Sequence, residues 1–284
     1  MKMEKHIHGG DVYHHAGCID FSANCNPLGT PLRVKEAIIE SLDHINDYPQ
    51  VGCAPLKEAI AKYEQVKKEQ VVCGNGAAEI IFSLCRGLKP RKALIPAPTF
   101  AEYQQALHSV DCQVDFFPLD REKQFALKED FIKSLKPELD VVFLCNPNNP
   151  TGILIERPVL EGILKRCQEL EIFLVVDECF LDFVPEPEKY TLKAFLEEYE
   201  NLFLLKAFTK RYAIAGVRLG YGLCGNKELL EKIESVCQPW NVSSMAQAAG
   251  LAALEEKAYV EEGRQITFKE AAYLKKEIEV LGYK

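Results

Sequence analysis

Residues 172–180 read IFLVVDECF, an unbroken apolar run followed by two acidic residues, Asp177 and Glu178. A strand that is apolar on both faces is typical of a parallel sheet covered by helices on both sides. Three more short apolar runs occur, KALIP at 92–96, DVVFLC at 140–145 and LFLL at 202–205, and helical patterns such as PLKEAIAKYEQV at 55–66 alternate with them. The chain is therefore predicted to fold as an α/β protein with a mainly parallel sheet sandwiched by helices.

The composition limits the classes of partner. The chain has 284 residues, 48% of them hydrophobic, and a formal net charge of −8. Without a basic stripe, this charge argues against nucleic acid and anionic membranes, so small molecules and further copies of the chain are the expected partners. The amino-terminal residues lack the apolar core of a signal peptide and no apolar run could span a bilayer, which predicts a cytoplasmic protein.

Cysteine and histidine residues do not indicate a metal or a disulfide framework. The eleven cysteines are scattered singly, without a C-x-x-C pair, and are expected to be reduced core residues. Histidines gather near the amino terminus, but no cysteine or carboxylate pattern with ligand spacing accompanies them. Solvated histidines are therefore expected there, and no metal.

Each predicted strand is followed by a loop that carries polar or aromatic residues. The loops read APTFAEY at 97–103, NPNNPTG at 146–152, DECFLDF at 177–183 and KAFTK at 206–210. In open parallel sheets ligands bind beyond the carboxyl ends of the strands, so these four loops are expected to converge on one site. This convergence would place Lys210 in a cleft.

The residues of that cleft suit a single cofactor. A lysine amine such as that of Lys210 forms a Schiff base with an aldehyde, and an aspartate such as Asp177 keeps a pyridine nitrogen protonated. The segment CGNGAAEIIFSLC at 73–85 is a glycine-containing turn that opens a helix, and N–H groups at a helix start bind phosphate. Together these features indicate a pyridoxal 5′-phosphate site.

The segments GNGAAEI, APTF, NPNNPTG, VVDECF and FTKRYAIAGVRLGY, in this order, resemble the fold-type I pyridoxal-phosphate enzymes of the class I/II aminotransferase superfamily. The resemblance implies that Lys210 binds the cofactor aldehyde and carries the proton at the substrate α-carbon, and that Asp177 pairs with the pyridine nitrogen. It implies a homodimer with shared sites, in which Tyr48 reaches the phosphate of the neighbouring subunit's cofactor. The other implied cofactor-binding residues are Asn149 at the ring hydroxyl, Phe100 on the ring face, and Gly76, Ala77, Ala78, Thr209 and Arg218 at the phosphate.

Simpler interpretations exist for each of these residues taken alone. Lys210 could be a surface lysine, Arg218 a structural ion-pair partner, and Asp177 a helix cap. The segment GNGAAE could belong to a dinucleotide-binding oxidoreductase, but the third glycine of that motif is missing. A nicotinamide-dependent oxidoreductase therefore remains only as an analogy of fold.

Two branches of the superfamily are close to this pattern. HGGDVY at 8–13, IDFSANCNPLG at 19–29 and Phe180 resemble the branch that decarboxylates L-threonine O-3-phosphate to (R)-1-aminopropan-2-yl phosphate for cobalamin biosynthesis. In that branch the amino-terminal arm closes over the site, which implies that His8 and Asn24 contact the substrate phosphate. The histidinol-phosphate aminotransferase branch, which usually has tyrosine at the position of Phe180, is the alternative.

The resemblance also predicts the division of the chain into domains. Residues 1–45 would form the amino-terminal arm and the start of a small domain, 46–238 the large cofactor-binding domain, and 239–284 part of a carboxyl-terminal small domain. Helical patterns are expected at 243–263 and 266–284. The family pattern continues beyond Lys284, so the small domain is expected to be truncated, and a shortened, inactive protein that keeps the cofactor fold is a further alternative.

Overall fold

The computed structural model describes residues 9–15 and 17–283. Within them, seven strands form one sheet in the order β1-β7-β6-β5-β4-β2-β3. Strand β7 runs antiparallel to both of its neighbours, and all other neighbouring strands are parallel. The strands are β1 Val71–Gly74, β2 Lys92–Ala97, β3 Gln113–Pro118, β4 Val141–Cys145, β5 Phe173–Asp177, β6 Leu202–Ala207 and β7 Gly220–Cys224. The four strands predicted from apolar runs are confirmed as β2, β4, β5 and β6.

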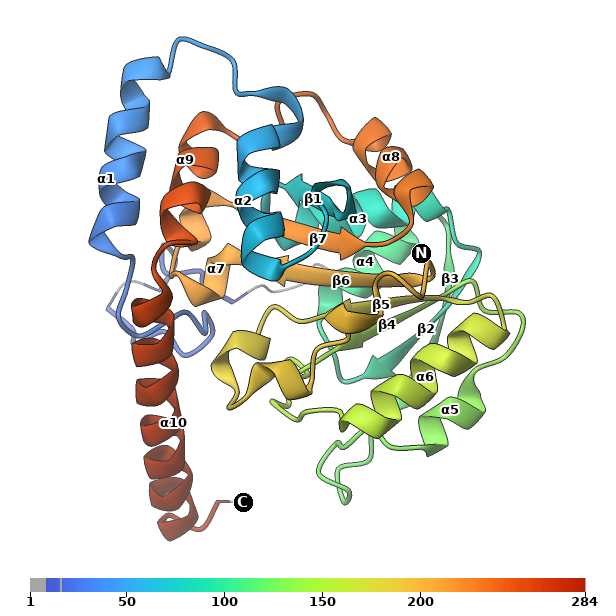
Figure 1. The fold of residues 1–284 in the computed structure, drawn as a ribbon. Coiled ribbons are helices and arrows are strands. Elements are labelled where there is room, and N and C mark those ends of the chain that lie inside the picture. The colour runs from blue at the N-terminus through green and yellow to red at the C-terminus, as the bar shows by residue number, and fades with distance from the viewer. Residues whose placement is uncertain (1–8, 16, 284) are drawn as a thin grey trace.

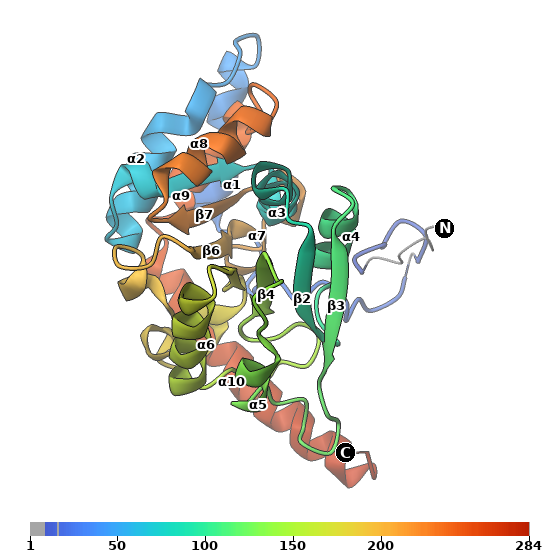
Figure 2. The same ribbon diagram turned by 90° about the vertical axis from the view of Figure 1, so that its right-hand side faces the viewer.

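Helices cover both faces of the sheet (Figures 1 and 2). They are α1 Leu32–Ser41, α2 Ala54–Glu64, α3 Gly76–Leu88, α4 Ala101–His108, α5 Asp130–Ser134, α6 Arg157–Glu169, α7 Phe208–Arg211, α8 Lys227–Val236, α9 Ser244–Ala253 and α10 Lys257–Val280. The predicted sandwich of helices around a mainly parallel sheet is thus confirmed. No helix in the described ranges has both the length and the apolar character needed to cross a membrane.

Side chains alternate along each strand and so divide between two apolar cores. On one face, residues such as Phe143, Val175 and Leu205 pack with side chains of α3, α4 and α8. On the other face, residues such as Leu144, Val176 and Leu204 pack with side chains of α2, α6 and α9. Strands β4, β5 and β6 are buried almost completely on both faces, which explains their continuous apolar sequences.

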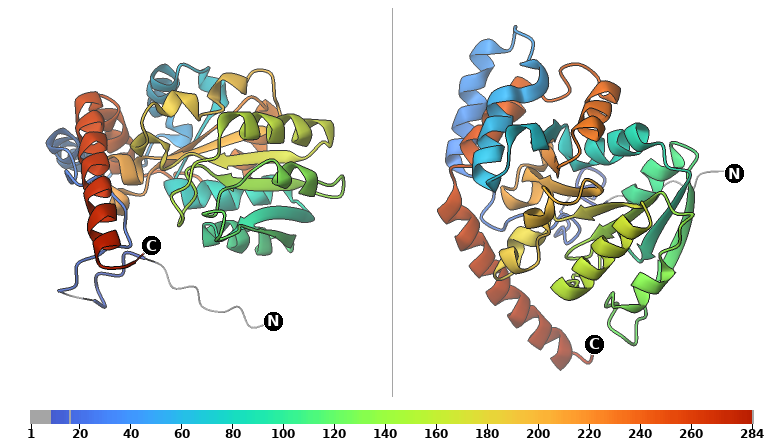
Figure 3. Two further views of the ribbon diagram at one scale, coloured as in Figure 1. Left: turned by 90° about the horizontal axis from the view of Figure 1, so that it is seen from below. Right: turned by 45° about the vertical axis from the view of Figure 1, so that its right-hand side comes forward.

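The end of the chain differs from the sequence prediction in one respect. The break between the last two helices falls at residues 254–256, not near Gly263, and α10 then continues for 24 residues. Gly263 lies inside α10 because the helix packs closely on Asn26 there, and a Cβ atom at Gly263 would lie 2.2 Å from Asn26 Nδ2. Beyond this contact α10 extends past the body of the molecule (Figures 1 and 3).

Elements from both ends of the chain lie together on one side of the sheet. Helix α1 packs against α9, and the hydroxyl of Tyr259 on α10 donates a hydrogen bond to the carbonyl of Gly29 (Figure 1). These contacts bring residues of the predicted segments 1–45 and 239–284 together. The domain boundaries themselves stay a prediction.

Candidate cofactor and active site

Asp177 is a buried carboxylate at the carboxyl end of β5, with only 5% of its surface exposed. The Tyr103 hydroxyl donates a hydrogen bond to Oδ2 at 2.7 Å, and the backbone N–H of Cys179 donates one to Oδ1 at 2.9 Å. Burial raises the pKa of Asp177, and the hydrogen bonds from Cys179 and Tyr103 only partly oppose it. In residues 9–15 and 17–283 no lysine, arginine or histidine side chain makes an ion pair with this carboxylate. A protonated ring nitrogen would supply the missing cation.

The start of α3, the start of β7 and the Arg218 side chain meet in very close contact. Gly76 has φ +81°, and a Cβ atom there would lie 2.5 Å from Nη2 of Arg218. A Cβ atom at Gly220 would lie 2.5 Å from the backbone nitrogen of Ala77. Glycine is favoured at Gly76 because its φ is positive, and at Gly220 because the backbone of α3 approaches without room for a side chain. The first turn of α3, which includes Ala77 and Ala78, thus lies beside an arginine.

This arrangement can bind a phosphate group. Arg218 is exposed and donates a hydrogen bond to the carbonyl of Ala215 at 3.2 Å, but it forms no ion pair with a carboxylate of the described residues. Free N–H groups at a helix start, the positive end of the helix dipole and an arginine are the usual ligands of phosphate. The residues present here therefore fit the phosphate of the predicted cofactor.

Lys210 lies on the short helix α7, directly after β6, and is half-buried. Its Nζ is 5.9 Å from the centre of the Phe180 ring, on the loop that follows Asp177. Asp20 is close enough for Lys210 to contribute to the lowered pKa of Asp20, although the hydrogen bonds from Ser22 are the main cause. The amino-terminal segment therefore lies near Lys210, and the ammonium group makes no ion pair among the described residues.

Hydrogen bonds join the loops at 97–103 and 146–152 to each other, and Tyr103 joins the first of these loops to Asp177. The Thr99 hydroxyl donates to Oδ1 of Asn148 at 2.9 Å, and the Asn148 amide donates to the Pro98 carbonyl at 3.0 Å. Phe100 packs edge to face on Tyr103 at 5.5 Å, and Tyr103 binds Asp177. The side chain of the next residue, Asn149, is half-buried.

The amino-terminal segment is fixed to the lysine helix through its backbone. The N–H of Asn26 donates to the carbonyl of Lys210 at 2.9 Å, and the Cys25 thiol donates to the carbonyl of Thr209 at 3.8 Å. Thr209 is half-buried at the start of α7, and Asn24 is exposed beside these two contacts. His8 lies outside the described residues.

Tyr48 is the predicted site residue that the structure does not bring to the others. Its ring stacks on Trp240 at 4.4 Å, and 78% of its surface is exposed. A contact with the cofactor of a second subunit requires an exposed position of this kind. Tyr103 was missed in the sequence, although its position one helical turn after Phe100 is a signal that could have indicated it.

The fold and this constellation define a class of protein. Residues 16–284 match the family described as "Aminotransferase class I and II", and the chain belongs to this family of pyridoxal-phosphate-dependent enzymes. The chain is 39% identical to the threonine-phosphate decarboxylase of Salmonella typhimurium over 91% of its own length and 73% of the relative. It is 35% identical to a putative threonine-phosphate decarboxylase of Caldanaerobacter subterraneus, over 99% of its own length and 76% of the relative.

A solved structure from the neighbouring branch has the same fold. The histidinol-phosphate aminotransferase from Clostridium acetobutylicum superposes with a TM-score of 0.85 and 33% identity, over 92% of this chain and 77% of that one. The chain thus spans about three quarters of the length of the relatives it matches.

Proposed function

We propose that the chain is a cytoplasmic carboxy-lyase that uses pyridoxal phosphate to convert L-threonine O-3-phosphate to (R)-1-aminopropan-2-yl phosphate, a step of cobalamin biosynthesis. The observation that carries this proposal is the 39% identity to the Salmonella threonine-phosphate decarboxylase over 91% of the chain. The geometry around Asp177 and Arg218 suits both branches of the family, so it supports the cofactor and not the choice of substrate. Phe180, whose ring faces Lys210, agrees with the decarboxylase branch.

The cofactor would be bound by residues from five segments of the chain. Lys210 would bind the aldehyde carbon, Asp177 would hold a proton on the ring nitrogen, and Asn149 would bind the ring hydroxyl. Phe100 would contact the ring face. The phosphate would be bound by Thr209, Arg218 and the N–H groups of Gly76, Ala77 and Ala78.

In the proposed reaction, the protein residues would control the breaking of one bond at the α-carbon and the delivery of one proton to it. When bound, pyridoxal phosphate supplies an electron-poor ring that accepts the electron pair of a bond broken at the amino acid α-carbon. Asp177 supports this role by keeping the ring nitrogen protonated, and after loss of carbon dioxide Lys210 delivers a proton to the α-carbon. We infer that His8 and Asn24 hold the substrate phosphate. The contacts of Cys25 and Asn26 with α7 support this placement, because they hold the adjoining arm against the lysine helix.

The test of substrate and reaction is product analysis with the cofactor-loaded chain. L-Threonine O-3-phosphate should release carbon dioxide, and Lys210→Ala should lose both this activity and the visible absorption band of the bound cofactor. Formation of a keto acid without carbon dioxide would support the histidinol-phosphate aminotransferase alternative. An absorption band without any turnover would support the alternative of an inactive protein that keeps the cofactor fold.

We also infer a homodimer in which Tyr48 reaches the phosphate of the neighbouring cofactor. Large apolar side chains are exposed in and after α1, at Leu32 (70%), Ile39 (64%), Ile45 (67%) and Val51 (64%). Such a concentration of exposed apolar side chains is typical of a surface that another protein covers. Sedimentation should give twice the mass of the chain, and Ile45→Glu should shift it toward the single chain, whereas a monomeric parent would contradict the proposal.

A further inference from the structure

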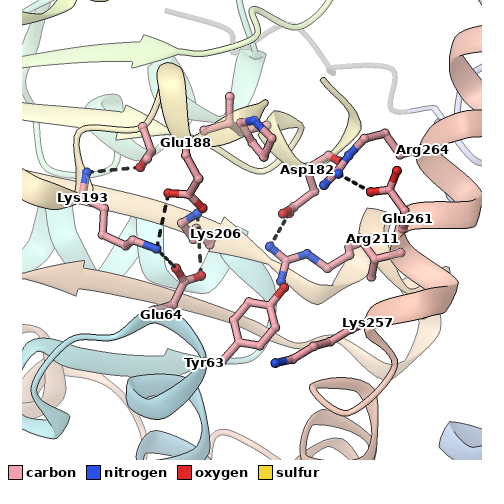
Figure 4. Close-up of a pocket in the computed structure, with 14 residues that line it drawn as sticks. Tyr63, Glu64, Asp182, Glu188, Lys193, Lys206, Arg211, Lys257, Glu261 and Arg264 are labelled. Atoms are coloured by element: carbon pink, nitrogen blue, oxygen red, sulfur yellow. Dashed lines mark hydrogen bonds and ion pairs between the residues drawn. The ribbon is translucent and has the colours of Figure 1, made fainter. Parts of the chain in front are cut away.

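A second pocket lies on the other side of the strands that carry the cofactor-site residues. Its volume is about 300 Å³, and its walls are the end of α2, the segment 181–193 and the start of α10 (Figure 4). Because side chains alternate along β6, Lys206 points into this pocket, whereas Leu205 and Ala207 face the core beside the cofactor site. The two sites are therefore separate and lie back to back.

Charged residues line most of the pocket, and most of them are paired. Lys193 contacts Glu64 at 3.1 Å and Glu188 at 3.9 Å, and Lys206 contacts the buried Glu178 at 3.2 Å. Arg211 pairs with Asp182, and Arg264 with Glu261 (Figure 4). Every carboxylate of the pocket thus has a cationic partner.

Two cationic groups of the pocket remain without a full set of partners. Lys257, at the start of α10, is exposed and forms no ion pair among the described residues, and Figure 4 shows its side chain extending toward Tyr63 and Arg211. Arg211 is only 3% exposed, and its Nε has no hydrogen-bond partner in the part of the chain that the structure describes. Its guanidinium lies over the Tyr63 ring at 5.3 Å. A buried N–H donor without an acceptor is unfavourable, so this donor is available to a bound anion.

We propose that this pocket binds a small oxyanion, a carboxylate or a phosphate monoester, between Lys257 and Arg211. Arginine recognises both groups well because its planar guanidinium presents several donors, and lysine adds a point charge. A pocket of this volume suits a small metabolite. The anion would join α10 to the body of the molecule.

Occupation of this pocket would also act close to the cofactor site. Arg211, which lines the pocket, is the direct chain neighbour of Lys210, and Glu178, which pairs with the pocket residue Lys206, is the direct chain neighbour of Asp177. The inference does not depend on the proposed reaction, because it concerns residues on the opposite face of the sheet.

The test is calorimetric titration of the full chain, with and without added pyridoxal phosphate, at constant ionic strength. Inorganic phosphate is the probe in one titration and succinate in the other. The anion that binds more tightly identifies the class of ligand. In the chain loaded with pyridoxal phosphate we expect one saturable site per chain, with at least about tenfold weaker binding in Lys257→Ala. Lys269→Ala is the matched control, because Lys269 is also exposed on α10 but does not line the pocket.

Arg218→Ala separates the pocket from the cofactor's phosphate site, because it removes an arginine of the cofactor site and should leave the binding that Lys257→Ala weakens in place. The proposal is overturned if neither anion shows saturable binding, or if Lys257→Ala and Lys269→Ala bind equally. It is also overturned if Arg218→Ala alone abolishes binding, because the anion would then occupy the cofactor site. These outcomes do not depend on turnover, so a failed decarboxylase assay would leave them intact.

Discussion

The hydroxyl of Tyr103 donates a 2.7 Å hydrogen bond to Asp177 in the buried region at the carboxyl end of β5. Both residues are nearly inaccessible, with 0% and 5% exposure, and the Tyr103 ring stacks on Phe143 at 5.2 Å. The tyrosine is therefore fixed by packing, and it fixes the carboxylate in turn. Since a hydrogen bond to an ionised acceptor stabilises the charge, Tyr103 helps to keep Asp177 ionised.

Tyr103→Phe should weaken cofactor binding. The substitution keeps the packing on Phe143 but removes a hydrogen bond to a charged group, which is typically worth about 1.5–3 kcal/mol. Affinity for pyridoxal phosphate, followed by visible absorption, should fall roughly tenfold or more. The matched control is Tyr199→Phe, because Tyr199 also packs on an aromatic ring but makes no side-chain hydrogen bond within residues 9–15 and 17–283. Equal affinities of the two variants would refute the role of Tyr103.

Asp177→Asn should stabilise the cofactor-free chain and weaken cofactor binding at the same time. Because burial raises the pKa of Asp177 above its usual 3.8, the folded chain holds more protons than the unfolded chain just above pH 3.8. The stability of the cofactor-free parent should therefore fall as the pH rises through this range, and the asparagine variant lacks this loss. At pH 7 the cofactor-free variant should have a higher melting temperature than the parent, and this difference in melting temperature should disappear near pH 3.

The effect of added cofactor on the same melting temperatures tests the second half of that prediction. Pyridoxal phosphate should raise the melting temperature of the parent by mass action but raise that of Asp177→Asn much less. Asp43→Asn, a substitution at an exposed position, should behave like the parent in both respects. A cofactor-free Asp177→Asn chain that melts below the parent at pH 7 would show that the carboxylate has a structural partner.

Gly220→Ala should disturb the phosphate site through the backbone. The new Cβ atom would lie 2.5 Å from the Ala77 nitrogen, so β7 and the start of α3 must separate. Overpacking of this kind typically costs about 1–3 kcal/mol, and cofactor affinity should fall at least about tenfold because the N–H groups of α3 shift. Gly216→Ala is the control, because a Cβ atom there meets nothing within 4 Å. Denaturant unfolding and absorption titration measure the two effects.

The sequence predicted the strands and loops of the cofactor site well, and the opposite face of the sheet poorly. Strands β4, β5 and β6 are recognisable because complete burial on both faces requires unbroken apolar runs. The contact of Tyr103 with Asp177 could not be predicted, because the direction of the tyrosine side chain depends on how α4 packs on the sheet. The pairing of Glu64 with Lys206 was not predictable, since these residues are distant in sequence and meet only through the folding of α2 onto β6. The length of α10 was also missed, because Gly263 marks a close contact with Asn26 and not a helix end.

Glu64 should account for part of the acid sensitivity of the fold. It is 2% exposed, accepts a hydrogen bond from the Tyr221 hydroxyl and lies 3.1 Å from Lys193 and 3.7 Å from Lys206. Burial opposes its ionisation, but attraction by Lys206, Arg211 and Lys193 outweighs burial and lowers the pKa of Glu64 from 4.5 to about 2. Its contribution is therefore present above pH 4.5 and is lost as the pH falls toward 2, and it amounts to about 3 kcal/mol.

Glu64→Gln should remove this pH dependence. At pH 7 the variant should be less stable than the parent, because Lys193 and Lys206 lose a charged partner in a buried position. The difference in unfolding free energy should shrink as the pH falls below 4.5, since Glu64 is then protonated in the unfolded parent while it still carries its charge in the folded parent. Denaturant unfolding at several pH values from 7 to 3 measures this change.

Glu58→Gln, which alters an exposed pair with Lys68 at 3.6 Å, should differ from the parent by less than about 1 kcal/mol at every pH. A constant gap between Glu64→Gln and the parent would show that the pKa of Glu64 does not differ between the folded and the unfolded chain.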